Sequence, residues 1–258
     1  MINIILTTAL IILIIMTITW FISLLIGEMS IVDVGWGLGF ILITLLHVFR
    51  LENVTTVQLI MTAVITLWGL RLATYIFIRN KGKGEDPRYK AWRNDWGKNT
   101  WWISYFKVFL LQGVLMLLIA LPIQAVMWSS GNTLSMLQVA GIAIWTVGFL
   151  FETIGDWQLY RFKSKAENKG KVMQSGLWRY TRHPNYFGES LVWWGVFFIS
   201  IGSGNIWLSL ISPVLLTFML LKVSGVSMLE ARYAGNDAYS VYKRTTSAFL
   251  PLPPKRLP

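Results

Sequence analysis

The chain has 258 residues, of which 55% are hydrophobic and 14% are charged, and its formal net charge is +11. The mean hydropathy of +0.55 lies far above that of soluble globular proteins and predicts an integral membrane protein. The sequence contains no cysteine, which excludes disulfides, thiolate metal sites and cysteine nucleophiles. It has two histidines, so we expect no histidine-built metal centre.

Seven apolar runs are long enough to cross about 30 Å of hydrocarbon as helices. In chain order they cover residues 2–26, 31–49, 56–78, 104–128, 136–160, 186–203 and 206–229. The first run follows no basic segment and is too long for the apolar part of a secretion signal, so we expect it to be retained. The sequence therefore predicts an all-α integral membrane protein of about seven transmembrane helices, forming a single domain over residues 1–258.

Lysine and arginine are concentrated in three segments: residues 79–107, residues 160–182 and the tail beyond residue 230. Each segment follows an odd-numbered span, so all three lie on one side of the membrane. Because cytoplasmic loops hold the excess of positive charge, the N-terminus is predicted outside and the C-terminus in the cytoplasm, in a bacterial inner membrane. Basic residues confined to short membrane-flanking loops are typical of topology and of contact with membrane lipids, and argue against nucleic acid as a partner.

The loop "KGKGEDPRYKAWRNDWGKNT", residues 81–100, combines near-alternating charge with aromatic residues. This composition fits an interfacial, partly helical lid, and it fits a solvated connector equally well.

Ionisable side chains inside the spans are costly, at least about 2.5 kcal/mol each at mid-membrane unless they are paired or hydrated. In the fifth span Glu152, Asp156 and Tyr160 recur at helical spacing and form one stripe, which we expect to lead into Arg161 and Lys163. Such a stripe is typical of a helix face that borders a cavity. The alternative is an internal ion-pair network, for example between Asp156 and Arg71.

The stretch "SGLWRYTRHPNYFGES", residues 175–190, precedes the sixth span. Pro184 suits the first position of a helix, with Thr181 or His183 as the cap, so a positive helix-dipole end that attracts phosphate is predicted here. Arg179, Arg182 and His183 stand beside that end. Asn185 and Glu189, four residues apart, project one turn deeper. A basic outer part and a hydrogen-bonding inner part suit a nucleotide cofactor whose phosphates stay near water.

Four segments together resemble a bacterial branch of the steroid 5-alpha-reductase superfamily. They are "SIVDVGWGLGF" at 30–40, "KGEDPRYKAWRNDWG" at 83–97, "SGLWRYTRHPNYFGE" at 175–189 and "TSAFLPLPP" at 246–254. The Arg-His-Pro-x-Tyr part is also similar to isoprenylcysteine carboxyl methyltransferases, which use it to hold S-adenosylmethionine. Asn185 and Glu189 match the Asn-x-x-x-Glu of the reductases, which favours the reductase side.

The resemblance implies seven helices, NADPH in a cytoplasm-facing cavity among the later helices, and a lipophilic enone entering from the bilayer. Arg161, Lys163 and Arg179 are the implied phosphate partners, and the tail tyrosines Tyr233, Tyr239 and Tyr242 resemble residues that close over the cofactor. The cofactor-binding candidates are Glu152, Asp156, Arg161, Lys163, Arg179, Tyr180, Arg182, His183, Asn185, Glu189 and Tyr242.

Reduction of an enone transfers hydride to the β-carbon and requires a donor for the charge that grows on the carbonyl oxygen. Asp33 is the catalytic candidate, because an apolar surround would keep its carboxyl protonated, and Glu28 is the reserve. The reductases pair a glutamate in the second helix with a tyrosine in the third; here Trp68 stands at the tyrosine position and Tyr75 lies two turns on. Near Asp33, glycines 35, 37 and 39 leave room for close helix packing or for a flat ligand.

The leading hypothesis is thus an NADPH-dependent membrane oxidoreductase, a monomer whose active site faces the cytoplasm and whose partner is a hydrophobic substrate. The second is an S-adenosylmethionine-dependent methyltransferase that uses Arg182, His183 and Tyr186. The third is a non-catalytic lipid-binding or transport protein, which should show polar groups along a continuous path across the membrane. Most polar groups here gather toward the cytoplasmic half, which favours the enzyme.

Overall fold

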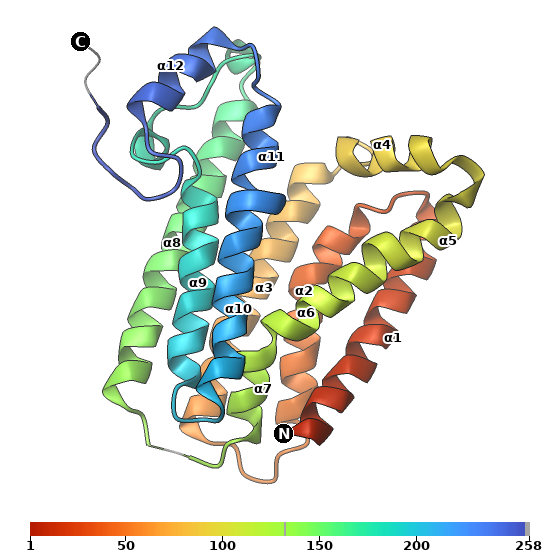
Figure 1. Cartoon of the computed structure of the whole chain (residues 1–258), viewed down its shortest axis with the longest axis vertical. Coiled ribbons are helices and arrows are strands. Elements are labelled where there is room, and N and C mark those ends of the chain that lie inside the picture. The colour runs from red at the N-terminus through yellow and green to blue at the C-terminus, as the bar shows by residue number, and fades with distance from the viewer. Residues whose placement is uncertain (132, 256–258) are drawn as a thin grey trace. The chain divides into compact units, whose positions relative to one another are not determined.

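A computed structural model of the protein describes residues 1–131 and 133–255, and in this part of the chain every regular element is a helix (Figure 1). Six helical segments of these residues are long and apolar enough to cross a membrane: Ile2–Ile26, Ile31–Val48, Thr56–Asn80, Pro87–Ile119, Met136–Lys163 and Ile206–Ala231. They overlap six of the seven predicted spans, and the fourth begins 17 residues before and ends nine residues before the predicted 104–128. The all-helical membrane class predicted from composition is therefore confirmed.

The predicted sixth span corresponds to α9 (Pro184–Ser200), which has 17 residues. At 1.5 Å per residue it is about 26 Å long, just short of the hydrocarbon thickness of a bilayer. Its length alone does not make it a membrane span.

The chain divides into two compact units, each built from two stretches of sequence. The first comprises Met1–Ser135 and Ser200–Ser212, and the second comprises Met136–Ile199 and the residues from Pro213 onward. The division falls inside α10 (Ile206–Phe218), at Pro213, whose ring removes a helical hydrogen bond. The units are described in turn.

The first unit holds most of the amino-terminal helices. They are α1 (Ile2–Ile26), α2 (Ile31–Val48), α3 (Thr56–Asn80), α4 (Pro87–Trp96), η1 (Gly97–Asn99), α5 (Thr100–Ser104), the π-helical turn η2 (Tyr105–Leu110), α6 (Leu111–Ile119) and α7 (Leu121–Trp128). The apolar run predicted at 104–128 is interrupted between α6 and α7. Pro122 sits in the first turn of α7 and cannot donate the hydrogen bond that would continue the helix.

Helices α2 and α3 lie so close that their backbones touch. A Cβ atom at Gly37 would lie 2.6 Å from the carbonyl oxygen of Gly69, and a Cβ at Gly69 would lie 2.6 Å from that of Gly37. A Cβ atom at Gly39 would lie 2.7 Å from the side chain of Met116, which already fills this space. A Cβ at Gly35 would meet Thr19 at 3.4 Å, an ordinary contact distance. Of the two roles considered for this glycine run, Gly37 and Gly39 serve close packing.

The charged loop after α3 contains an ordered helix, α4, which in Figure 1 (yellow) runs crosswise to α3. Asp86 caps the helix by accepting from the Arg88 N–H, and Pro87 fills its first position. Glu85 accepts from the Met29 N–H (2.7 Å) and pairs with Arg93 (2.9 Å). Burial alone would raise the pKa of Glu85, but these donors bring it below its ordinary value. The loop is thus held to the α1–α2 turn through Glu85.

The second unit contains α8 (Met136–Lys163), α9 and the carboxyl-terminal elements. Between α8 and α9 lie the short 3-10 turns η3 (Ala166–Asn168) and η4 (Gly176–Arg179). After α10 the chain continues through the π-helical turn η5 (Met219–Val223), α11 (Val226–Ala231) and α12 (Asp237–Thr245).

A stripe of glycines at seven-residue spacing lets α8 and α9 pack against each other. Gly141, Gly148 and Gly155 lie on one face of α8, and Gly188 and Gly195 lie on the facing side of α9. A Cβ at Gly188 would lie 2.4 Å from the backbone nitrogen of Glu152, a distance at which no side chain fits. This close approach brings together the polar side chains that flank the glycine stripe on the two helices.

Candidate functional site

Helix α9 begins at Pro184, as predicted from the position of this proline. The carbonyl of His183 accepts the N–H of Phe187 (3.0 Å), and the hydroxyl of Thr181 accepts the N–H of His183 (3.3 Å). Asn185 therefore projects from the first turn of the helix and Glu189 from the second.

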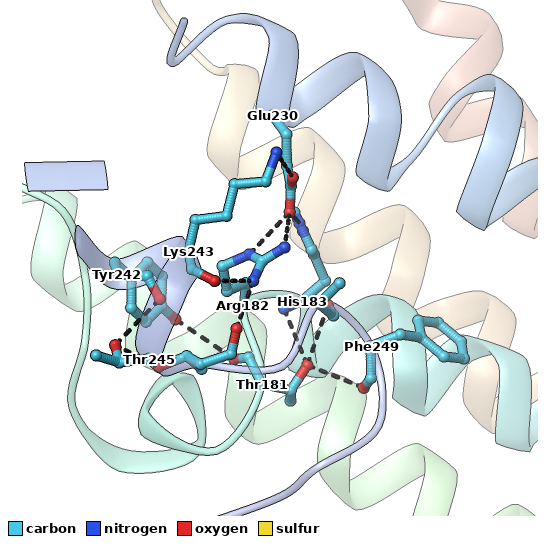
Figure 2. Close-up of polar contacts among 10 residues, drawn as sticks. Thr181, Arg182, His183, Glu230, Tyr242, Lys243, Thr245 and Phe249 are labelled. Atoms are coloured by element: carbon cyan, nitrogen blue, oxygen red, sulfur yellow. Dashed lines mark hydrogen bonds and ion pairs between the residues drawn. The ribbon is translucent and has the colours of Figure 1, made fainter. Parts of the chain in front are cut away.

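Arg182 forms the centre of a buried charged cluster just before α9 (Figure 2). Its guanidinium pairs with Glu230 of α11 at 2.7 Å and also donates to the carbonyls of Lys243 and Thr246. The ammonium of Lys243 approaches the other oxygen of Glu230 (3.2 Å). The side chains of Arg182 and Glu230 are 6% and 12% exposed, so the pair is shielded from water.

The same short stretch binds the carboxyl-terminal segment along its backbone. Arg182 N–H donates to the carbonyl of Ser247 (2.9 Å), and Thr181 donates to that of Phe249 (2.9 Å). Tyr242, buried in α12, donates its hydroxyl to the carbonyl of Trp178. Arg182 and Tyr242 are predicted cofactor contacts. In the structure they hold the carboxyl-terminal segment against residues 178–182.

His183 is fully buried, with its ring stacked on Tyr186 at a centroid distance of 5.4 Å. Its Nε2 lies 3.4 Å from Glu230, and its Nδ1 has no hydrogen-bond partner among the described residues. Burial lowers the pKa of His183 to about 4, with the Arg182 charge acting in the same direction and Glu230 opposing it. The ring is therefore neutral at pH 7.

A second polar group lies where α8 and α9 meet. Asn185 Nδ2 donates to Asp156 Oδ1 at 3.0 Å, and Asp156 is 4% exposed. Glu152, one turn earlier on α8, is buried as well, and Glu189 is half-buried one turn further along α9. Asn185 Oδ1 is buried and has no hydrogen-bond partner among the described residues. The structure thus joins Asp156 and Asn185, which sequence reasoning had placed on separate spans, and leaves one acceptor there for a donor.

The stripe expected along α8 divides at its end. Successive residues of a helix are rotated by about 100°, so Lys163 falls on the face of Glu152 and Asp156, whereas Arg161 falls on the opposite face. Arg161 lies over the ring of the exposed Trp157, 5.4 Å from the ring centroid. The prediction that the stripe leads into both basic residues holds for Lys163 alone.

Two further predicted cofactor contacts, Arg179 and Tyr180, are exposed at the end of η4. Tyr233 stacks on Tyr239 with a centroid distance of 4.4 Å. Burial raises the pKa of Tyr239 to about 12, so its phenol stays protonated at neutral pH.

In the first unit, Asp33 lies in the first turn of α2 and is held by two residues of α4. Tyr89 donates its hydroxyl to Asp33 Oδ1 (2.6 Å), and Arg88 donates to Oδ2 (3.0 Å). Gln112 donates in turn to the Tyr89 hydroxyl (3.2 Å). The surroundings of Asp33 differ from the apolar ones expected, since α4 brings a guanidinium to a carboxyl more than fifty residues away.

The other two catalytic candidates have separate neighbourhoods. Glu28 lies in the turn between α1 and α2, where its N–H donates to the Ser23 carbonyl. The ring of Tyr75 on α3 lies between the guanidinium groups of Arg71 and Arg79, at 5.5 and 5.7 Å.

Sequence reasoning missed Glu230 and Tyr89, and it did not connect Arg88 with Asp33; these residues complete the two charged clusters. A signal for Glu230 exists, because a buried arginine requires an acidic partner and the chain has only 12 acidic residues. The sequence does not show that these two residues pair, because Arg182 and Glu230 are 48 positions apart.

Comparison with known proteins agrees with a membrane family. No curated protein and no solved structure matches the chain. The model of the family DUF1295, described as proteins of unknown function, matches residues 19–246, a range that includes Asp33, the α8–α9 polar group and the Arg182 cluster. The chain therefore belongs to the DUF1295 family.

Proposed function

We propose that the protein is a membrane-bound NADPH-dependent reductase of a conjugated C=C bond in a hydrophobic, steroid- or isoprenoid-like enone. The observation that carries this proposal is the Asp156–Asn185 pair, with its buried unpartnered acceptor, at the contact of two apolar helices. The resemblance to the steroid 5-alpha-reductase superfamily supports it. In this proposal α9 is a seventh crossing, the N-terminus is outside, and the cofactor site faces the cytoplasm of a bacterium.

The α8–α9 residues fit the nicotinamide end of such a cofactor. Asn185 Oδ1 can accept from a carboxamide N–H, and Glu189 and Asp156 can accept from ribose hydroxyls. Lys163 shares the helix face of Asp156 and Arg179 is exposed at the end of η4, so both side chains can donate to phosphates near water. When bound, NADPH supplies the hydride that passes to the β-carbon of the enone.

In this proposal the carbonyl-polarising role belongs to Asp33 and its partners. Asp33 accepts from Arg88 and Tyr89, so it acts by orienting the guanidinium of Arg88, whose other N–H groups can donate to the developing oxyanion. Asp33→Asn should retain NADPH binding and lose most turnover of a 3-oxo-4-ene steroid, followed by NADPH absorbance. Full activity of the variant would remove Asp33 from this role.

The test is to compare the thermal unfolding of the purified protein with NADPH, NADH and S-adenosylmethionine. A ligand that binds the native state raises the unfolding temperature, and we expect the largest rise with NADPH. Asn185→Ala and Glu189→Ala should reduce that rise, while Gln174→Ala, an exposed amide of the same unit, should not.

The same comparison decides between the two enzyme hypotheses. The buried acids of α8 and α9 would also attract the sulfonium of S-adenosylmethionine. A larger rise with that ligand would replace the reductase by the methyltransferase, and no rise with any of the three would contradict both.

A further inference from the structure

A groove of about 220 Å³ opens on the exposed side of the second unit, at the end of α8. Its walls are the last turns of α8, with Trp157 and Arg161, and the following loop, with Lys165, Asn168 and Met173. Pockets for complete cofactors and drug-sized ligands occupy about 300–1,000 Å³. The groove therefore suits a small group attached to something larger outside it.

The residues that line the groove carry a net positive charge. Arg161 and Lys165 are its only charged members, both basic, and Asn168 adds an amide. Arg161 is held over the ring of Trp157 at 5.4 Å, which positions the guanidinium at the groove. Lys165 is 56% exposed and pairs loosely with Glu167 at 3.6 Å, a surface contact that contributes little energy. An anion in the groove can therefore displace Glu167 from Lys165.

The unfavourable effect of the negative end of α8 on an anion is reduced here, because two of its last carbonyls accept side-chain hydrogen bonds. Asn168 donates its amide to the carbonyl of Phe162 (2.9 Å), and Ser164 donates its hydroxyl to that of Arg161 (2.9 Å). These caps satisfy groups that would otherwise repel a phosphate.

An apolar track leads from the groove along the same face of α8. Val147, Leu150, Ile154 and Trp157 recur at three- and four-residue spacing, and all are 40–54% exposed. From the first to the last of them the helix rises about 15 Å, which is half of the hydrocarbon thickness of a bilayer. The track thus has the length of an acyl chain in one leaflet.

We propose that this groove binds the phosphate headgroup of an anionic glycerophospholipid, with an acyl chain along the track on α8. Among the described residues, the groove is lined by two basic side chains and by no acidic one, and the acidic contact of Lys165 is the exposed pair with Glu167. This lining favours a phosphodiester of net negative charge over a zwitterionic headgroup, whose ammonium the two basic side chains would repel. This proposal assigns Arg161 to the lipid headgroup instead of to the cofactor. It does not depend on the proposed function.

The experiment measures the thermal unfolding temperature of the full-length protein in non-ionic detergent as phosphatidylglycerol, phosphatidylcholine or inorganic phosphate is added. We expect a saturable rise with phosphatidylglycerol only. In Arg161→Gln/Lys165→Gln the apparent affinity for phosphatidylglycerol should fall about 30-fold. The control Lys169→Gln/Lys171→Gln removes the same charge from exposed positions of the same loop outside the groove and should retain the affinity.

Each other outcome overturns the proposal. An equal rise with phosphatidylcholine would mean non-specific lipid binding, and an equal rise with inorganic phosphate would assign the groove to a free anion. An equal loss of affinity for phosphatidylglycerol in the control Lys169→Gln/Lys171→Gln would mean that the overall charge of the loop, and not the groove, causes the effect. If the double variant does not fold, Lys165→Gln alone, at a largely exposed position, gives the same comparison, and unchanged affinity in it contradicts the proposal.

Discussion

At the scale of single residues, Arg182 shows how a motif residue can take a structural role. Its guanidinium donates to Glu230 and to two backbone carbonyls, all within a site shielded from water. Removing one member of a buried ion pair leaves the other charged and unpaired, which costs more than the pair itself contributes. Arg182 thus couples α11, α12 and the tail to the start of α9.

Arg182→Gln should therefore lower the free energy of unfolding by about 3 kcal/mol. Lys243→Gln removes a cation from the same carboxylate at a position that is 59% exposed, so its cost should stay below about 1 kcal/mol. Unfolding in mixed micelles of increasing dodecyl sulfate content measures both. Equal effects of the two substitutions would show that the Arg182–Glu230 pair does not couple these segments.

His183 makes the stability of the protein depend on pH. Its folded pKa of about 4 lies below the ordinary value of 6.5, so between these values the unfolded chain binds more protons than the folded one. The contribution of His183 is complete above pH 6.5 and is lost as the pH falls toward 4, by up to about 3 kcal/mol. Unfolding free energies across this window should show a slope that His183→Gln removes, and a slope unchanged in the variant would contradict the prediction.

The candidate residues could be recognised from sequence because charge is expensive in an apolar span. That argument identified Asp33 and Asp156 without any structure, and the helix start expected at Pro184 pointed to Asn185. It could not assign their partners, since Asp33 binds Arg88 and Tyr89 across a loop and Asp156 binds Asn185 of another helix. Partner choice depends on which helices touch, and spacing along the chain does not contain it.

At the scale of elements, the contact of α8 with α9 depends on glycine. In a bilayer the lipid tails are as apolar as the side chains, so helices associate through close packing rather than through burial of apolar surface. The seven-residue glycine spacing on both helices permits that approach and thereby positions Asp156 against Asn185. This spacing is present in the sequence, but it acquires meaning only once the two helices are known to face each other.

Gly188→Ala should destabilise the protein by about 2 kcal/mol, because the added Cβ meets the backbone of Glu152, which cannot move aside as a side chain can. Gly35→Ala is the matched control in a helix, since its Cβ would meet Thr19 at 3.4 Å, an ordinary contact. The control should be neutral or stabilising, given the helix propensity of alanine. Dodecyl sulfate unfolding of both variants is the measurement, and a tolerated Gly188→Ala would contradict close packing as the cause.

The composition of the loop that contains helix α4 did not decide the role of this element. Its alternating charges fitted a lid and a connector equally well, and the structure holds it in place through Glu85 and through Arg88 and Tyr89. The local sequence contains a signal for its start, since Asp86 and Pro87 form a capped first turn. Its docking depends on groups supplied by other parts of the chain, the Asp33 carboxylate and the Met29 N–H.

At the scale of the whole molecule, the number of crossings decides on which side each loop lies. Six helical segments of the described residues are long enough to cross, and α9, with 17 residues, determines whether the count is six or seven. The distribution of lysine and arginine favours seven, because it then places all three basic segments on one side.

Single cysteines test this arrangement cleanly because the chain has none of its own. Lys83→Cys and Lys169→Cys should react with a membrane-impermeant maleimide only in inside-out vesicles, and Glu52→Cys and Asn205→Cys only in right-side-out vesicles. Asn205 follows α9 directly, so its labelling from the same side as Lys169 would mean that α9 does not cross. The other three positions control for vesicle orientation.

By itself the sequence determined the class of the protein, the positions of its apolar helices and most residues of its polar groups. These follow from local properties: the cost of exposing backbone or charge to hydrocarbon, the caps of helices, and the 3.6-residue period. Only the tertiary structure decided that Arg182 pairs with Glu230 and that Asp33 meets Arg88. The reason is physical: charges in an apolar medium require partners, and which partner is near depends on helix contacts between distant parts of the chain.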